Sequence, residues 1–181
     1  DILGVSNLLD ICRNIKTLKF FLNVTTDKCY ENDDSKKAFK ETDNLGGKDI
    51  YSSSKACSEI LTKSFYESFL KNNIAVGTAR AGNVIGGGDW AQDRIVVDCM
   101  RAWSEGKSVE IRSPKATRPW QHVLEPLCGY LTLGASVYSN NSLHGEAFNF
   151  GPPEENDYSV KSLIEQMSKY WNDVNWLDDS D

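Results

Sequence analysis

Two short groups of residues in this sequence could transfer protons. The first is Tyr51 and Lys55, which lie four positions apart where an apolar helical pattern begins. Residues with this spacing share one helix face and lie one turn apart. A phenol is a poor base at neutral pH, and an ammonium group held beside it favours the phenolate. Tyr51 and Lys55 are therefore a candidate proton-transfer pair.

The second group is Thr25, Thr26, Asp27 and Lys28. It follows the apolar run at 20–24, which predicts a buried strand. In open parallel sheets, ligands bind just beyond the carboxyl ends of the strands. A hydroxyl, a carboxylate and an amine placed there would face the same crevice as the helix with Tyr51.

Helices and buried strands alternate along the chain. Periodicity predicts helices at about 1–14, 51–71, 95–105, 124–138 and 160–171, and strands at about 19–26, 74–79, 108–112 and 147–152. We expect Gly129 and Gly134 to interrupt the fourth helix and Ser159 to cap the last one. Such alternation indicates parallel βα units, the doubly wound α/β architecture.

Composition limits the classes of function. The chain has 181 residues, enough for one domain or one domain and part of another, and a formal charge of −6. That charge argues against nucleic acid or an anionic membrane as partner. The five cysteines form no C-x-x-C pair, which gives no metal or disulfide signal and suits a cytoplasmic protein. The chain starts without methionine, as a fragment would.

Four sequence blocks carry a resemblance to a known family. In order they are TTDKCY at 25–30, YSSSKAC at 51–57, ARAGNVIGGGDW at 79–90 and ATRPWQHVLEP at 116–126. They resemble the extended short-chain dehydrogenase/reductases that act on nucleotide sugars, and more closely the CDP-glucose 4,6-dehydratase family. Tyr-x-x-x-Lys alone is a weak signal, but the four blocks in this order are specific. The resemblance runs from about residue 1 to 171.

This resemblance implies an NAD-dependent lyase that makes CDP-4-keto-6-deoxyglucose from CDP-glucose, in deoxysugar and lipopolysaccharide biosynthesis. Tyr51 would take the proton from the sugar 4-hydroxyl, with Thr26 hydrogen-bonded to the same oxygen. Asp27 would be the acid at O6, and apolar surroundings would have to raise its pKa. Lys55 would lower the pKa of Tyr51 and bind the nicotinamide ribose, near which Thr25 also lies.

Lys28 departs from the related dTDP-glucose enzymes, which carry glutamate there as the presumed C5 base. A lysine can act as a base only when it is neutral, which requires burial or a neighbouring cation such as NAD⁺. The residue that removes the C5 proton is therefore open. The lysine itself points toward the CDP-sugar branch.

Four further residues are implied to bind the nucleotide-sugar substrate. Asn83 stands where the family has an amide near the pyrophosphate, and Arg118 matches its phosphate-binding arginine. Arg94 and Arg112 are weaker candidates. No metal is implied, and full-length members are commonly homodimers.

The resemblance also implies how the chain is divided. Residues 1–85 would be the C-terminal part of an NAD-binding domain of Rossmann type, which lacks its N-terminal half. Residues 86–181 would be mainly a truncated, smaller α/β substrate domain, with about 120–139 returning to the first domain. The family's glycine-rich turn for the NAD pyrophosphate is absent from these residues, so we expect this stretch alone to be inactive.

Two alternatives remain. Another nucleotide-sugar 4,6-dehydratase or a 4-epimerase of the same family would also need Tyr51 and Lys55, but an epimerase has little use for an acid at O6. A binding protein without activity would have no need of Tyr51 and Lys55, which are both present.

Overall fold

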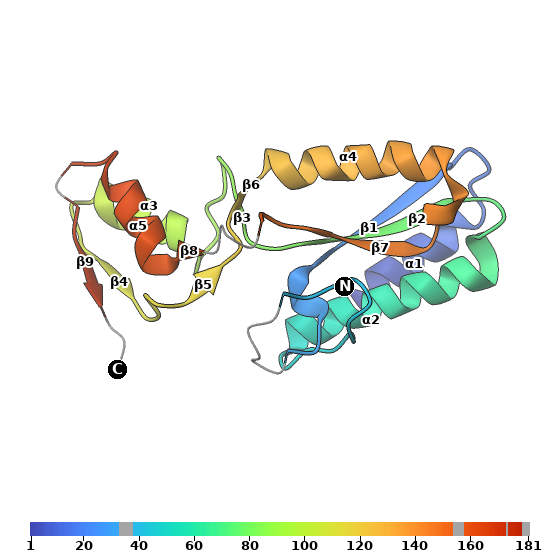
Figure 1. The fold of residues 1–181 in the computed structure, drawn as a ribbon, viewed down its shortest axis with the longest axis horizontal. Coiled ribbons are helices and arrows are strands. Elements are labelled where there is room, and N and C mark those ends of the chain that lie inside the picture. The colour runs from blue at the N-terminus through green and yellow to red at the C-terminus, as the bar shows by residue number, and fades with distance from the viewer. Residues whose placement is uncertain (33–37, 154–157, 173, 179–181) are drawn as a thin grey trace. The chain divides into compact units, whose positions relative to one another are not determined.

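The computed structural model describes residues 1–32, 38–153, 158–172 and 174–178. The chain forms two compact units (Figure 1). The first, here called the sheet unit, consists of Asp1–Gly82 and Leu124–Gly151. The second unit consists of Asn83–Val123 and Pro152–Asp181. Each is described by itself.

Three parallel strands form the centre of the sheet unit. They are β1 (Phe20–Thr26), β2 (Ala75–Ala81) and β7 (Glu146–Phe150), in the order β1-β2-β7. Thr26 pairs with Ala81, and Ala81 pairs with Phe150, so the three carboxyl ends are level. Every residue of β2 is buried, as expected for a central parallel strand covered on both faces.

Helices cover both faces of this sheet. Figure 1 shows α1 (Ile2–Cys12) and α2 (Ile50–Phe65) on one face and α4 (Leu124–Ser139) on the other. A π-helical turn, Tyr66–Leu70, continues α2. Alternate residues of β2 supply the two cores: Val76 packs with Leu9 and Leu70, and Ala79 packs with Leu133 and Val137. The predicted α/β fold with a parallel sheet is confirmed.

The expected interruption of the fourth helix is wrong, because α4 runs through Gly129 and Gly134. These positions instead lie against the sheet. A Cβ atom at Gly129 would stand 2.3 Å from Cε1 of Phe150, and one at Gly134 would stand 3.1 Å from Cε1 of Phe20. The missing side chains let α4 approach the sheet closely, so packing overrides the low helix propensity of glycine.

The returning segment is longer than expected. The sequence placed only about 120–139 back in the first domain, whereas the sheet unit takes in Leu124–Gly151. The reason is β7, which extends the sheet by pairing with β2. The functional names given to the two domains stay predictions.

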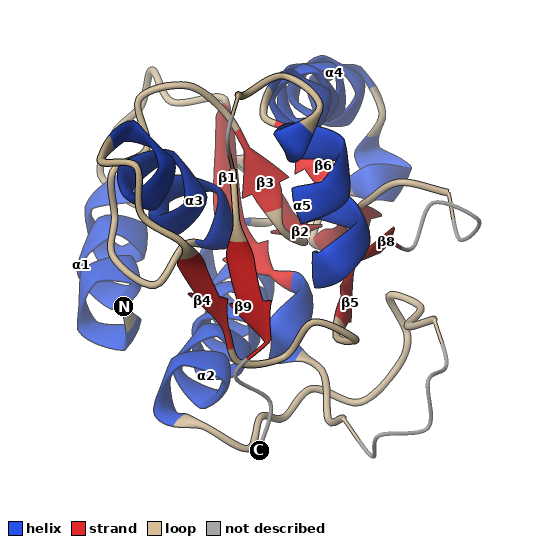
Figure 2. Ribbon diagram, turned by 90° about the vertical axis from the view of Figure 1, so that its left-hand side faces the viewer, coloured by secondary structure: helices blue, strands red, loops and turns tan. Residues whose placement is uncertain are grey.

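The second unit is built around two helices and a short sheet. The helices α3 (Ile95–Ser104) and α5 (Val160–Ser168) lie beside β4 (Val109–Ile111) and β9 (Trp176–Asp178), which are parallel (Figure 2). Its core contains Cys99, Trp103, Val109, Ile111 and Ile164. The predicted cap of the last helix is confirmed, because Oγ of Ser159 accepts a hydrogen bond of 3.1 Å from the Ser162 amide.

Two strand pairs complete the second unit. The strands β3 (Val84–Ile85) and β6 (Gln121–His122) are parallel, and β5 (Thr117–Arg118) and β8 (Tyr158–Ser159) are antiparallel. Among the helices of the described residues, none is both long and apolar enough to cross a membrane.

The close contact at Gly129 generates a prediction on stability. Gly129→Ala forces a methyl group into the Phe150 ring and should lower the free energy of unfolding by about 1–3 kcal/mol. Gly4→Ala is the control: it lies in α1 with no atom within 4 Å of the new Cβ, and should raise stability by about 0.5–1 kcal/mol. Urea denaturation measures both. Equal stabilities of the two variants would contradict this account of α4.

Candidate active site

Tyr51 and Lys55 lie at the start of α2, which is fixed by a capping interaction. Asp49 accepts hydrogen bonds from the amide of Ser52 (2.9 Å) and from its hydroxyl (2.6 Å). Nζ of Lys55 stands 5.8 Å from the centroid of the Tyr51 ring, so the structure brings the predicted pair together. Tyr51 is half exposed, and the Lys55 side chain is 21% exposed, with Nζ 3.3 Å from Oδ2 of Asp1.

Asp27 begins the turn that follows β1. This 3₁₀ turn, Asp27–Cys29, is capped by Thr26, whose hydroxyl accepts from the Lys28 amide (3.3 Å) and donates to Oδ1 of Asp27 (3.1 Å). Thr26 is buried and Asp27 partly buried. The turn contacts α2, which carries Tyr51. The two predicted proton-transfer groups therefore belong to elements that are packed against each other.

Lys28 lies near the beginning of α2. Hydrogen bonds from Ser52 are the main cause of the lowered pKa of Asp49, and the positive charge of Lys28 adds to it. Lys28 is exposed, so of the two conditions named above for a neutral amine, burial is not met. Its role as C5 base stays a prediction.

The structure contains a buried ion pair that the sequence analysis missed. Arg80 on β2 and Glu59 on α2 are each 4% exposed. Nε of Arg80 is 2.8 Å and Nη2 is 2.6 Å from Oε2 of Glu59. Burial alone would lower the pKa of Arg80, but hydrogen bonds to Glu59 and the charge of Glu59 outweigh burial and raise it. Glu59 lies four residues after Lys55, a spacing that puts both residues on one helix face. This spacing is the sequence signal that could have pointed to Glu59.

Two neighbours of the ion pair bear on the predicted site. The Thr25 hydroxyl donates to Oε1 of Glu59 (2.5 Å) and lies in the interior, an arrangement that does not favour its predicted contact with a cofactor. Burial, and next the charge of Glu59, raises the pKa of the Cys29 thiol to about 12. Cys29 is therefore protonated at neutral pH and unsuited to act as a nucleophile.

The four predicted substrate residues all lie in the second unit, on different elements. Asn83 is half-buried before β3, and Arg94, Arg112 and Arg118 are exposed. Arg112 donates to the Asp93 carboxylate at 3.2 Å, an ion pair open to solvent. Arg118 belongs to β5. Their binding roles stay predictions.

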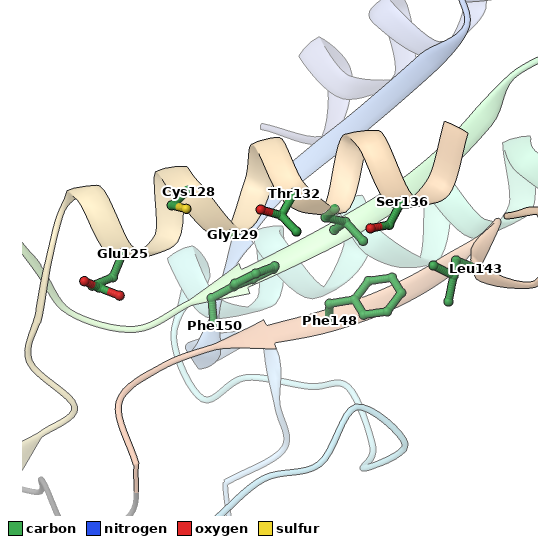
Figure 3. Close-up of a pocket in the computed structure, with 9 residues that line it drawn as sticks. Glu125, Cys128, Gly129, Thr132, Ser136, Leu143, Phe148 and Phe150 are labelled. Atoms are coloured by element: carbon green, nitrogen blue, oxygen red, sulfur yellow. The ribbon is translucent and has the colours of Figure 1, made fainter. Parts of the chain in front are cut away.

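A cavity of about 490 Å³ lies between α4 and β7 (Figure 3). It is lined by residues of both elements, among them Glu125, Cys128, Thr132, Ser136, Phe148 and Phe150. It is therefore on the face of the sheet that α4 covers, whereas Tyr51 and Lys55 lie on α2 at the other face. This cavity does not contain the predicted catalytic residues.

The fold, together with the groups at Thr26–Asp27 and Tyr51–Lys55, indicates the class of protein to which this chain belongs. A parallel α/β sheet with Tyr-x-x-x-Lys on a flanking helix and Thr-Asp at a strand end is the arrangement that the resemblance implied. Residues 1–134 match the family described as GDP-mannose 4,6 dehydratase. The chain belongs to this family.

Individual relatives add detail. The chain is 37% identical over 188 residues to a CDP-glucose 4,6-dehydratase of Salmonella typhimurium, covering 100% of this chain and 52% of that protein. It thus spans about half the length of that relative. Two solved structures share its fold. They are a dTDP-glucose 4,6-dehydratase of Bacillus anthracis in complex with NAD (TM-score 0.78, 21% identity, 99% of this chain and 56% of that one) and a UDP-glucuronic acid 4-epimerase of Bacillus cereus in complex with UDP-glucuronic acid and NAD (TM-score 0.79, 22% identity, 98% and 54%).

The cap at Asp49 generates a prediction on pH. Because the folded-state pKa of Asp49 is lowered, its stabilising effect is present above the unfolded value near 3.8 and is lost as the pH falls through the folded value. Asp49→Ala should therefore lower the melting temperature at pH 7 and lower it much less in strong acid. Melting temperatures of both proteins across the pH range measure this, and a difference that does not change with pH would count against the cap.

Proposed function

We propose that the protein containing this chain is an NAD-dependent lyase that converts CDP-glucose to CDP-4-keto-6-deoxyglucose. The main structural support is the packing of the Asp27 turn against the helix with Tyr51 and Lys55, which supplies an acid and a base from adjacent elements. CDP-glucose is proposed because the Salmonella relative has that name. The product would serve deoxysugar and surface polysaccharide synthesis.

Each residue has one part in the proposed reaction. Tyr51 takes the proton of the 4-hydroxyl during oxidation at C4, and Thr26 turns its one hydroxyl hydrogen from Asp27 to the same oxygen when the sugar is bound. The new ketone acidifies the C5 proton, for which Lys28 is the candidate base. Asp27 then protonates O6, which leaves as water. NAD held at its ribose by Tyr51 and Lys55 would supply the acceptor for the C4 hydride and its donor to C6, and the proton taken by Lys28 would return to C5.

The described residues fit the nicotinamide-ribose end of such a cofactor. Lys55 offers an ammonium donor beside the Tyr51 phenol, a suitable pair for ribose hydroxyls. Solved proteins of the same fold are NAD complexes, which supports NAD here. Because the 181 residues contain no Gly-x-x-Gly-x-x-Gly sequence, we expect this chain by itself neither to retain NAD nor to turn over substrate.

The remaining assignments follow from the same proposal. The sheet unit is the C-terminal part of the NAD-binding domain, and the second unit is the substrate domain. Asn83 and Arg118 bind the pyrophosphate of the sugar nucleotide, with Arg94 and Arg112 as weaker contributors. The whole protein acts in the cytoplasm.

The alternative is a different nucleotide-sugar 4,6-dehydratase or a 4-epimerase. The shared fold with a UDP-glucuronic acid 4-epimerase keeps this alternative open. Asp27 argues for dehydration, because an epimerase returns the hydride to C4 and expels no hydroxyl group.

We further propose that the full-length protein is a homodimer that pairs α1 and α2 of two copies. These helices contact each other, and each exposes apolar side chains to solvent. On α1 they include Leu8 and Ile11, and on α2 Ile60, all more than half exposed. A second copy would bury this apolar surface by a twofold contact.

The reaction is tested on the longest natural form of the protein that contains this chain. Incubation with NAD and CDP-glucose should give a product lighter by one water, detected by mass spectrometry. Tyr51→Phe and Asp27→Asn should each lower kcat by about 10²–10⁴-fold, because each removes a proton-transfer group. An unchanged mass with altered sugar stereochemistry would establish the epimerase instead, and water loss only from another sugar nucleotide would replace CDP-glucose.

The dimer is tested on the same form of the protein. Leu8→Glu places a charge in the proposed contact and should raise the dimer dissociation constant by about tenfold or more. Leu131→Glu, on the exposed face of α4, is the control and should leave it unchanged. Light scattering coupled to size exclusion gives both masses. A monomeric wild type, or dimers that tolerate Leu8→Glu, would refute this interface.

A further inference from the structure

The ion pair of Arg80 and Glu59 is the centre of a closed hydrogen-bond network. Oε1 of Glu59 accepts from Thr25, and Oε2 accepts from Nε and Nη2 of Arg80. The remaining nitrogen, Nη1, donates to the Tyr30 hydroxyl (2.7 Å) and to the backbone oxygen of Glu41 (3.1 Å). Within the described residues, no buried side-chain nitrogen or oxygen lacks a partner.

The members of this network flank the predicted catalytic residues. Thr25 directly precedes Thr26, and Tyr30 directly follows the turn that contains Asp27. Glu59 is one helical turn after Lys55. The network therefore joins both ends of the Asp27 turn to the helix that carries the proposed base.

Tyr30 also ties down the loop that leads to α2. Its hydroxyl donates to Oδ1 of Asn149 (2.6 Å), and Nδ2 of Asn149 donates to the Phe39 backbone oxygen (3.1 Å). The Tyr30 ring stacks on the Phe39 ring, with centroids 4.7 Å apart and planes 4° apart. Cζ of Arg80 lies 4.8 Å from the centroid of the Tyr30 ring, so the guanidinium also makes a cation–π contact.

We propose that Arg80, Glu59 and Tyr30 are positioning residues. They hold the Thr26–Asp27 turn at a fixed position relative to Tyr51 and Lys55. This rests on the proposed dehydratase function. Oxidation at C4 needs Tyr51, whereas expulsion of the 6-hydroxyl needs Asp27 at a matching distance from the same sugar. A loosened network should therefore slow elimination more than oxidation.

The sharpest variant is Tyr30→Phe. Removing Arg80 or Glu59 would leave a buried charge without its partner and endanger folding. Tyr30→Phe deletes only the hydroxyl between Arg80 and Asn149 and retains the stacked ring. Tyr130→Phe is the control: Tyr130 is partly buried and lies on α4, with its ring edge-on to Phe150 and the two ring centroids 5.2 Å apart.

The kinetic test uses the longest natural form with NAD and CDP-glucose. Tyr30→Phe should lower kcat by about tenfold with little change in KM. Reduced nicotinamide should also accumulate, because oxidation at C4 then outpaces elimination, and its absorbance measures this. Asp27→Asn should give the same absorbance signature, and Tyr130→Phe should behave as wild type. A lowered melting temperature of Tyr30→Phe with kcat and absorbance unchanged would show a structural role only and overturn the proposal.

Amide hydrogen exchange provides a readout without cofactor or substrate. Segments 24–30 and 38–47 should exchange faster in Tyr30→Phe than in wild type and remain unchanged in Tyr130→Phe. Equal exchange in both variants would overturn the positioning role. If wild type fails to dehydrate any sugar nucleotide, the proposed function falls, and faster exchange in Tyr30→Phe still supports the network's hold on the turn.

Discussion

A strand that is buried along its whole length cannot carry a charged side chain unless a partner is buried with it. Strand β2 is such a strand, and Arg80 lies near its carboxyl end. The cost of removing a guanidinium from water is offset here by a carboxylate, a phenol and a backbone oxygen. Each of these partners comes from a different segment. The burial of one charge thus fixes where α2, the turn after β1 and the loop before α2 stand relative to the sheet.

The residues of this network differ from Tyr51 and Lys55 in their access to solvent. Arg80 and Glu59 are buried and bonded to protein groups, so they are out of reach of a substrate. Tyr51 and Lys55 lie at the same helix's beginning, where one is half exposed and the other partly so. Proton transfer requires such access, whereas precise placement requires rigidity. A single helix meets both needs because its start is exposed and its middle is packed on the sheet.

Local patterns were enough to predict most elements of this fold. Alternating apolar runs located the strands and helices, and the four-residue spacing correctly placed Lys55 beside Tyr51. Ser159 was predicted as a cap because a cap depends only on its immediate neighbours. These features share one property: the interacting residues are close in sequence, so their types and spacing hold the necessary information.

The features that sequence reasoning missed depend on contacts between distant residues. A glutamate within a helix, such as Glu59, ordinarily faces solvent, and only the arrival of Arg80 from β2 makes its burial favourable. Gly129 was expected to interrupt its helix because glycine has a low helix propensity. Its packing partner, Phe150, belongs to a later strand and could not be recognised from the local sequence. The pairing of β7 with β2 likewise joins residues far apart in the sequence, such as Gly77 with Glu146 and Ala81 with Phe150.

The same reasoning explains why Asp27 and Lys28 differ in environment although they are adjacent. In the turn after β1, Thr26 holds the Asp27 side chain by a hydrogen bond. The neighbouring residues Thr25 and Tyr30 are hydrogen-bonded to the ion pair of Glu59 and Arg80. Asp27 is therefore partly enclosed, while Lys28 projects to the surface near Asp49. The two adjacent side chains therefore meet different surroundings: that of Asp27 is held against the turn by Thr26, and that of Lys28 is open to solvent.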